Sequence, residues 1–280
     1  MTQSPIAVSC GAATDTGLRR RINEDAHIAA SPVFLVADGM GGHHAGEVAS
    51  AAVIDVFARL AGRPSIGVEE LQAAVARARR RVDELPPGAG SGAGTTLSGV
   101  VIADVDGDGY WLTVNLGDSR TYRLSAGVLE QISVDHSVVQ ELVDRGELDA
   151  AAAASDRRRN VITRALGAGS DAEPDYWLLP AEEGDRILVC SDGLSGELSR
   201  ERLHAVLRSE PHPQAAATRL VHEAMLHGGR DNITALVVDA LSVRSRRDRG
   251  DAGSTLPSAS TRDEIDEDTA PRSEALGGRR

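Results

Sequence analysis

The 280-residue sequence predicts an α+β domain in which helices and sheets form layers, and three observations support this fold class. Apolar residues make up 41% of the chain, enough for a substantial core. Predicted strands and helices come in blocks and not in strict alternation, which disfavours a doubly wound parallel sheet. Several short acidic sequences follow or flank apolar runs, as at Asp38 and Asp192, so carboxylates are expected at the ends of buried strands.

The first third of the chain predicts one strand and two helices. Residues 33–37 form an apolar run that is typical of a buried strand. Residues 47–61 and 67–85 show helical spacing, and Pro86-Pro87-Gly88 ends the second helix. The residues expected to face the core are Val48, Ala52, Val56 and Leu60 in the first helix and Leu71, Val75 and Val82 in the second.

After residue 95 the hydrophobic period becomes that of strands, and short helices follow later in the chain. Strands are predicted at 96–103, 110–115, 120–124, 187–190 and 232–241, and helices at 136–145, 200–208 and 213–227. Residues 104–109 are a predicted turn. Their sequence also matches the start of an EF-hand loop, but position 115 is Asn where that loop needs Glu. Residues 147–160 are rich in Ala and then Arg, and predict a mobile segment.

Composition divides the chain into residues 1–242, a single folded domain, and residues 243–280, a disordered charged tail with almost no large apolar residue. The tail's charges cancel, so the net charge of −12 belongs to the domain. An acidic domain argues against nucleic-acid binding and suits a protein that gathers divalent cations. Two cysteines, no signal peptide and no membrane-spanning run predict a cytoplasmic protein without a membrane partner.

Two aspartates point to a metal site. Asp38 and Asp192 each come after an apolar run and before a glycine. One such pair would be an ordinary turn. Two of them, with Asp231 and Glu24 near other apolar segments, favour a shared ligand. Oxygen-only ligands favour Mg²⁺ or Mn²⁺ over zinc, and two such ions about 3.5–4 Å apart can activate a shared water for attack at phosphorus.

Eight colinear sequence blocks between about residues 8 and 240 carry a family resemblance. They are Arg20-Arg21-Ile22-Asn23-Glu24-Asp25, Val36-Ala37-Asp38-Gly39-Met40-Gly41-Gly42-His43, Ala93-Gly94-Thr95-Thr96, Asn115-Leu116-Gly117-Asp118-Ser119-Arg120, Asp135-His136-Ser137, Ile162-Thr163-Arg164-Ala165-Leu166-Gly167, Cys190-Ser191-Asp192-Gly193-Leu194 and Arg230-Asp231-Asn232-Ile233-Thr234. With these blocks, the chain resembles the bacterial metal-dependent protein Ser/Thr phosphatases of the PPM family, the protein phosphatase type 2C group. The resemblance implies two stacked antiparallel β-sheets flanked by α-helices.

The resemblance also implies which residues hold two Mn²⁺ or Mg²⁺ ions. Asp38 would bridge both ions and the Gly39 carbonyl would ligate one of them. Asp192 and Asp231 would hold one ion, and Glu24 would act on the other through water.

Further roles follow from the same resemblance. Asp25 would support the ligands from behind, and Arg20 would clamp the substrate phosphate with its guanidinium fork. Asp118 would belong to a weaker third metal site. Residues 137–165 would form a flap beside the cleft, in which the arginines at 157–159 are either a solvated run or an attraction for acidic phosphoproteins.

Two departures from the family pattern affect this interpretation. Gly196 stands where many members carry an aspartate for the third ion, so that ion is expected to be weakly held. Met40 stands where eukaryotic relatives carry a histidine, and it cannot donate a proton to the leaving alkoxide. His43 and His44 are nearby alternatives, although each also fits a structural or solvated histidine.

The predicted function is hydrolysis of phosphoserine and phosphothreonine in proteins, by direct attack of a hydroxide that bridges the metal ions. Ser119 and Ser191 lack the setting of an activated nucleophile, so no phosphoenzyme is expected. The implied partners are phosphorylated proteins, with a Ser/Thr kinase as functional counterpart and the enzyme acting as a monomer. Two alternatives stay open: a phosphatase for one small phosphoprotein, such as an anti-sigma-factor antagonist, and a non-catalytic binding module on the same fold.

Overall fold

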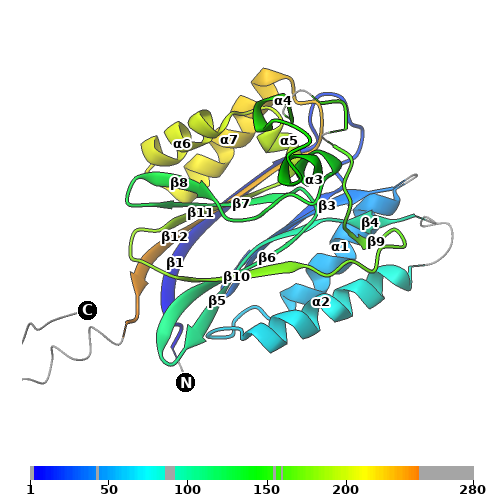
Figure 1. Ribbon diagram of the computed structural model, residues 1–280. Helices are drawn as coiled ribbons and strands as arrows, with labels where there is room; N and C mark the ends of the chain where they lie inside the picture. Colours follow the sequence, from blue (N-terminus) through cyan, green and yellow to red (C-terminus); the bar gives the residue numbers. More distant parts are fainter. Residues whose placement is uncertain (1–2, 42–43, 86–91, 154–155, 159, 246–280) are drawn as a thin grey trace, which may run out of the picture. The chain divides into compact units, whose positions relative to one another are not determined.

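Two antiparallel sheets form the centre of the molecule in a computed structural model that describes residues 3–41, 44–85, 92–153, 156–158 and 160–245 (Figure 1). One sheet has five strands in the order β1-β12-β11-β7-β8. These are Ile6–Asp15, Ile233–Val243, Arg186–Cys190, Arg120–Ser125 and Val128–Gln131. The other has seven strands: six in the order β10-β6-β5-β3-β4-β9, and β2 paired with β3. They are Asp175–Pro180, Asp108–Leu116, Leu97–Val105, Val33–Met40, Gly94–Thr95, Leu166–Gly167 and, for β2, Asp25–Ala30.

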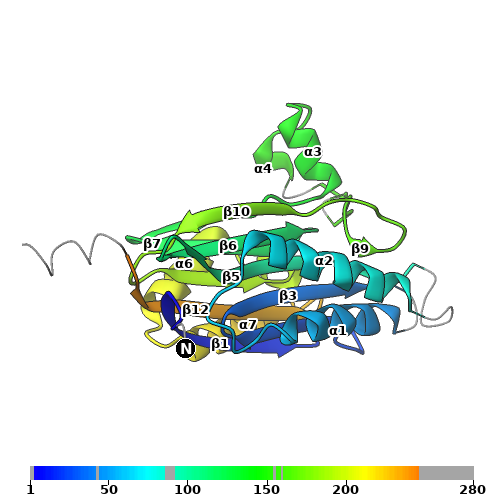
Figure 2. The same ribbon diagram turned by 90° about the horizontal axis from the view of Figure 1, so that it is seen from below.

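Helices cover the outer face of each sheet. On the seven-stranded sheet lie α1 (Ala45–Ala58) and α2 (Val68–Asp83), and on the five-stranded sheet lie α6 (Arg200–Ser209) and α7 (Pro213–His227). The four-residue α5 (Asp192–Ser195) follows β11 directly. In Figure 2, α3 (Val138–Asp144) and α4 (Ala150–Ala153) project away from the sheets. This arrangement confirms the predicted α+β sandwich.

Three apolar layers hold the sandwich together. The middle layer lies between the sheets and includes Phe34, Trp111 and Leu236, all fully buried. The outer layers join each sheet to its own helices. Because both faces of both sheets are covered, the central strands are buried along most of their length and are rich in Val, Leu and Ile.

A polar contact crosses the middle layer. The Trp111 indole on β6 donates to Asp185 Oδ2 over 3.0 Å, and Arg123 on β7 forms an ion pair of 2.9 Å with the same oxygen. Asp185 is buried, and its other carboxylate oxygen has no hydrogen-bond partner. The two sheets are thus joined by a buried charge whose partners come from both of them.

Most predicted elements are present, with three corrections. The prediction that Val48 faces the core is wrong: its side chain is 38% exposed, and Ala45, Ala49, Val53 and Phe57 form the buried face of α1. The segment predicted to be mobile contains α4. Six strands, β1, β2, β4, β8, β9 and β10, were not predicted. Residues 104–109 do form a tight hairpin turn, with positive φ at Asp106 and Gly107, and not a calcium loop.

No helix in the described part of the chain is long and apolar enough to cross a lipid bilayer. The predicted tail lies almost wholly outside the described residues, since the structure is described only as far as residue 245.

Candidate active site

Seven of the eight predicted site residues line one small pocket of about 240 Å³. They are Arg20, Glu24, Asp38, Gly39, Asp118, Asp192 and Asp231. The eighth, Asp25, lies next to Asp38 in the β2–β3 pairing. The pocket therefore gathers side chains from positions more than two hundred residues apart.

The backbone fixes Asp38 firmly. Asp38 and Gly39 lie within β3, not after it as predicted, because the strand continues to Met40. The Asp38 amide donates to Thr96 Oγ1 over 2.9 Å, and its carbonyl accepts from Thr96 N, also at 2.9 Å. At Gly39 a Cβ atom would lie 2.2 Å from the Gly46 carbonyl oxygen, so the close approach of α1 to this strand requires glycine.

Asp25 is held by two hydroxyl groups. Ser191 and Thr234 both donate to its Oδ2, over 2.8 and 2.7 Å. Its buried Oδ1 has no hydrogen-bond partner. Ser191 also accepts from the Thr234 amide, so its hydroxyl is fully engaged, which agrees with the prediction that it is not a nucleophile.

Asp231 faces a cation and not its neighbouring carboxylates. Its Oδ2 accepts from the half-exposed Arg20 guanidinium over 2.7 Å, and its Oδ1 accepts from the Asn232 amide over 2.9 Å. Asn232 accepts in turn from the Glu24 amide, and donates to the carbonyls of Thr16 and Ile22. Sequence reasoning gave Asn232 no role, although it stands inside one of the family blocks.

Carboxylates crowd the floor of the pocket. The pKa of Asp118 is raised to about 8 and that of Asp25 to about 7, mainly by burial and in part by nearby carboxylates. The pKa values of Asp38 and Asp192 are raised for the same two reasons, burial first. Such a cluster is costly unless a cation neutralises it.

The donor set suits hard divalent ions, since it offers carboxylate oxygens and the Gly39 carbonyl. The unpartnered Oδ1 of Asp25 and the raised pKa values show a local excess of negative charge. Within the described residues, however, no three His, Cys, Asp or Glu side chains already surround a common point. The residues therefore fit the ions by the chemistry of their donor atoms.

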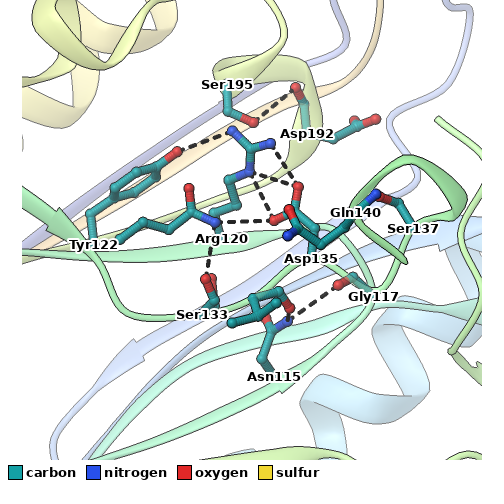
Figure 3. Close-up of polar contacts among 12 residues, drawn as sticks. Asn115, Gly117, Arg120, Tyr122, Ser133, Asp135, Ser137, Gln140, Asp192 and Ser195 are labelled. Atoms are coloured by element: carbon teal, nitrogen blue, oxygen red, sulfur yellow. Dashed lines mark hydrogen bonds and ion pairs between the residues drawn. The ribbon is translucent and has the colours of Figure 1, made fainter. Parts of the chain in front are cut away.

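The loop that carries Asp118 is tied to the start of the flap. Gly117 and His136 exchange hydrogen bonds, Gly117 N to His136 Nδ1 at 3.2 Å and His136 N to the Gly117 carbonyl at 2.9 Å. Arg120 binds the Asp135 carboxylate through Nε and Nη2, and reaches the Tyr122 hydroxyl on its other side (Figure 3). Ser119 contacts Thr96 Oγ1 at 2.8 Å in the buried interior, as expected of a residue that is not a nucleophile.

The alternatives for the proton donor remain predictions. His44 is exposed and lies 3.4 Å from Glu47, and it does not line the pocket. His43 lies outside the described residues. Met40 does line the pocket, and Asn160 and Ile162 of the flap join it there, which sequence reasoning did not foresee.

Comparisons with known proteins agree with this geometry. The family model described as protein phosphatase 2C matches residues 19–227. The Ser/Thr protein phosphatase PstP of Mycobacterium tuberculosis is 39% identical over 246 residues, covering 86% of this chain but only 46% of that protein. The Ser/Thr phosphatase stp of Listeria innocua is 33% identical over 248 residues, covering 84% of this chain and 97% of that protein.

A solved structure extends the comparison to three dimensions. The catalytic domain of PstP in complex with two manganese ions superposes with a TM-score of 0.75 at 37% identity, covering 84% of this chain and 99% of that one. The chain belongs to the protein phosphatase 2C family of bacterial PPM phosphatases. It spans about half the length of the mycobacterial relative.

Proposed function

We propose that this chain is a metal-dependent phosphatase that hydrolyses phosphoserine and phosphothreonine in proteins. The observation that carries the proposal is the convergence of Asp38, Asp118, Asp192 and Asp231 on one pocket, with Arg20 at its edge. Family membership supports it, as does the manganese-bound structure of a relative. The catalytic domain would occupy residues 1–242, with residues 243–280 as a charged tail.

Each residue has a role in this proposal. Asp38 would bridge two Mn²⁺ or Mg²⁺ ions, with Gly39, Asp192, Asp231 and Glu24 as the further ligands. When bound, the two ions would activate water and neutralise charge on the phosphate. Arg20 currently binds Asp231 over 2.7 Å. If Asp231 ligated a metal ion instead, the Arg20 guanidinium would be free to bind two oxygens of the substrate phosphate and orient the substrate.

Asp118 and Asp25 act more indirectly. Asp118 would help to hold a third ion. That ion would be weakly held, because Gly196 supplies no second carboxylate. The carboxylate of Asp25 is held by the hydroxyl groups of Ser191 and Thr234. It would support the proposed ligand Asp38 from the neighbouring strand.

The test is hydrolysis of a phosphothreonine peptide by the purified chain in EDTA, Mg²⁺ or Mn²⁺. We expect turnover only with a divalent ion. Asp38→Ala should lower it by about 10³-fold, because several kcal/mol of charge stabilisation is lost. Calorimetric titration with Mn²⁺ should show weakened binding in that variant, while its circular dichroism spectrum is unchanged.

Asp55→Ala on the exposed face of α1 is the matched control and should behave as the unmodified protein. An Asp38→Ala protein that keeps most of its activity at saturating Mn²⁺ would refute the bridging role. A folded protein with no turnover under any divalent ion would instead favour the binding module.

Finer properties stay predictions: action in the cytoplasm, a Ser/Thr kinase as counterpart, a monomeric state and a single dedicated phosphoprotein substrate. Phosphorylated proteins as the substrate class agree with the names of the relatives, which are Ser/Thr phosphatases.

A further inference from the structure

A second cavity, larger than the first, opens directly beside the candidate active site. Its volume is about 730 Å³, and it shares Asp118, Asn160, Asp192 and Asp231 with the smaller pocket. The smaller pocket, at about 240 Å³, has room for a phosphoryl group and the ions but is only a third as large as the second cavity. A protein substrate must therefore place the residues next to its phosphorylated side chain elsewhere, and the larger cavity is continuous with the site.

Apolar side chains stand on both sides of this cavity. Val139 and Val143 come from α3, and Leu198 comes from the turn after α5. Val139 and Leu198 are buried, and Val143 is half-buried. These three side chains offer aliphatic contacts from two separate elements.

The two guanidinium groups that line the cavity are already neutralised. Arg120 binds Asp135 through Nε and Nη2 at 3.0 and 2.6 Å. Arg230 binds Glu197 through Nε and Nη2 at 2.8 and 2.9 Å, and its backbone amide adds a third bond of 3.1 Å. The carboxylates of the lining that have no such arginine partner within the cavity are the proposed ligands Asp118, Asp192 and Asp231.

We propose that this cavity binds a neutral aliphatic side chain of the substrate, close in sequence to the phosphorylated residue. The inference rests on the proposed phosphatase function. Among the described residues of the lining, an acidic side chain would find each guanidinium already paired with a carboxylate. A basic one would find each carboxylate paired with an arginine or committed to the ions. An extended peptide advances about 3.3 Å per residue, so a neighbour one or two positions away spans from one pocket to the other.

The first experiment compares phosphothreonine peptides that carry Leu, Asp or Lys at each of the two positions on either side of the phosphoresidue. p-Nitrophenyl phosphate, which has no flanking residues, is the reference substrate. At one position, Leu should raise kcat/KM about tenfold over Asp and Lys, the size of effect typical of an apolar subsite.

Variants on one helix then locate the effect. Val143→Asp should lower kcat/KM for the Leu peptide about tenfold relative to p-nitrophenyl phosphate, mainly through KM. Val143→Ala, which adds no charge, should lower the same ratio by a smaller factor. Val138→Asp makes the same chemical change on the same helix, away from the cavity lining, and should leave the ratio unchanged.

The outcomes separate this inference from the function on which it rests. If the peptides are hydrolysed but Leu, Asp and Lys serve equally, or if Val143→Asp lowers peptide and aryl phosphate turnover alike, the subsite is wrong while the phosphatase stands. A preference for Asp or Lys that Val143→Asp does not alter would also overturn it. If neither substrate is hydrolysed with any divalent ion, both proposals fail together.

Discussion

A single buried amide, that of Asn232, positions much of the candidate site. The residue is only 5% exposed. Its side-chain oxygen accepts from the Glu24 amide, and its side-chain nitrogen donates to the carbonyls of Thr16 and Ile22. These partners lie more than two hundred positions away in the sequence. Together with the Arg20–Asp231 ion pair, Asn232 therefore holds the segment that carries Arg20 and Glu24 against the segment that carries Asp231.

We expect Asn232→Ala to lower the free energy of unfolding by about 2–3 kcal/mol, because buried backbone groups lose their partners. Urea denaturation measures this loss. Asn232→Asp keeps the acceptor for Glu24 but turns a buried carboxylate oxygen towards the Thr16 and Ile22 carbonyl oxygens, and should lose at least as much stability as Asn232→Ala. An unchanged unfolding midpoint in Asn232→Ala would show that water replaces the amide without cost.

The sequence could identify the acidic residues of the site but not those that position them. Asp38, Asp192 and Asp231 are conspicuous because a carboxylate beside an apolar run needs a partner. Asn232 and Thr96 act through backbone groups that only folding brings near them, so no local pattern marks them. The bounds of β3 were predicted too short for a related reason: Asp38 and Gly39 are atypical of a strand, and tertiary pairing keeps them in one.

At the scale of elements, α6 and α7 are joined by a carboxylate with two arginine partners. Glu223 on α7 accepts from Arg202 on α6 at 2.6 Å and from Arg219, one turn away, at 2.9 Å. The hydrogen bond from Arg202 is the main cause that lowers the pKa of Glu223 to about 2. The pair sits at the surface, so its contribution is modest, about 1 kcal/mol or less.

A pH dependence follows from this shift. Because the folded-state pKa lies below the unfolded one of about 4.3, the stabilisation is present above pH 4.3 and is lost as the pH falls towards 2. Glu223→Gln should therefore unfold more easily than the unmodified protein at pH 7, with the difference shrinking by pH 3. Thermal unfolding at several pH values measures it, with Glu130→Gln on β8 as control. A difference that stays constant with pH would contradict this origin.

Elements with local signals were predicted well, and those defined by distant pairing were not. The bounds of α7 were predicted as 213–227 because Pro213 starts the helix and Gly228 ends it. In contrast, β1 is rich in small residues and gains its identity by pairing with β12, at the other end of the domain. The strand β10 similarly depends on its pairing with β6.

At the scale of the whole molecule, the buried Asp185 carboxylate connects the two sheets. Asp185 Oδ2 accepts from the Trp111 indole and the Glu182 amide and pairs with the Arg123 guanidinium, whereas Oδ1 has no hydrogen-bond partner. We expect Trp111→Phe to cost about 1–3 kcal/mol, because it leaves a buried charge with one donor fewer. Urea unfolding followed by circular dichroism measures the change.

Trp177→Phe on β10, where the residue is only half-buried, is a matched control and should cost less. Equal losses in the two variants would mean that ring volume, and not the indole donor, matters at position 111. The fold class itself was predictable from the order of element types, whereas this buried contact between β6, β7 and the turn before β11 was not.

The pairing of β1 with β12 also determines when the protein can become active. Asp15 pairs with Ile233, and the register continues to Ile6 and Val243, so β1 can pair only after β12, more than two hundred residues later in the chain, has been synthesised. Until β12 emerges, β1 lacks its neighbour, and the segments bearing Arg20 and Glu24 cannot meet Asp231 and Asn232. Such long-range pairing slows folding. A nascent or truncated chain that stops before β12 therefore lacks an assembled candidate site.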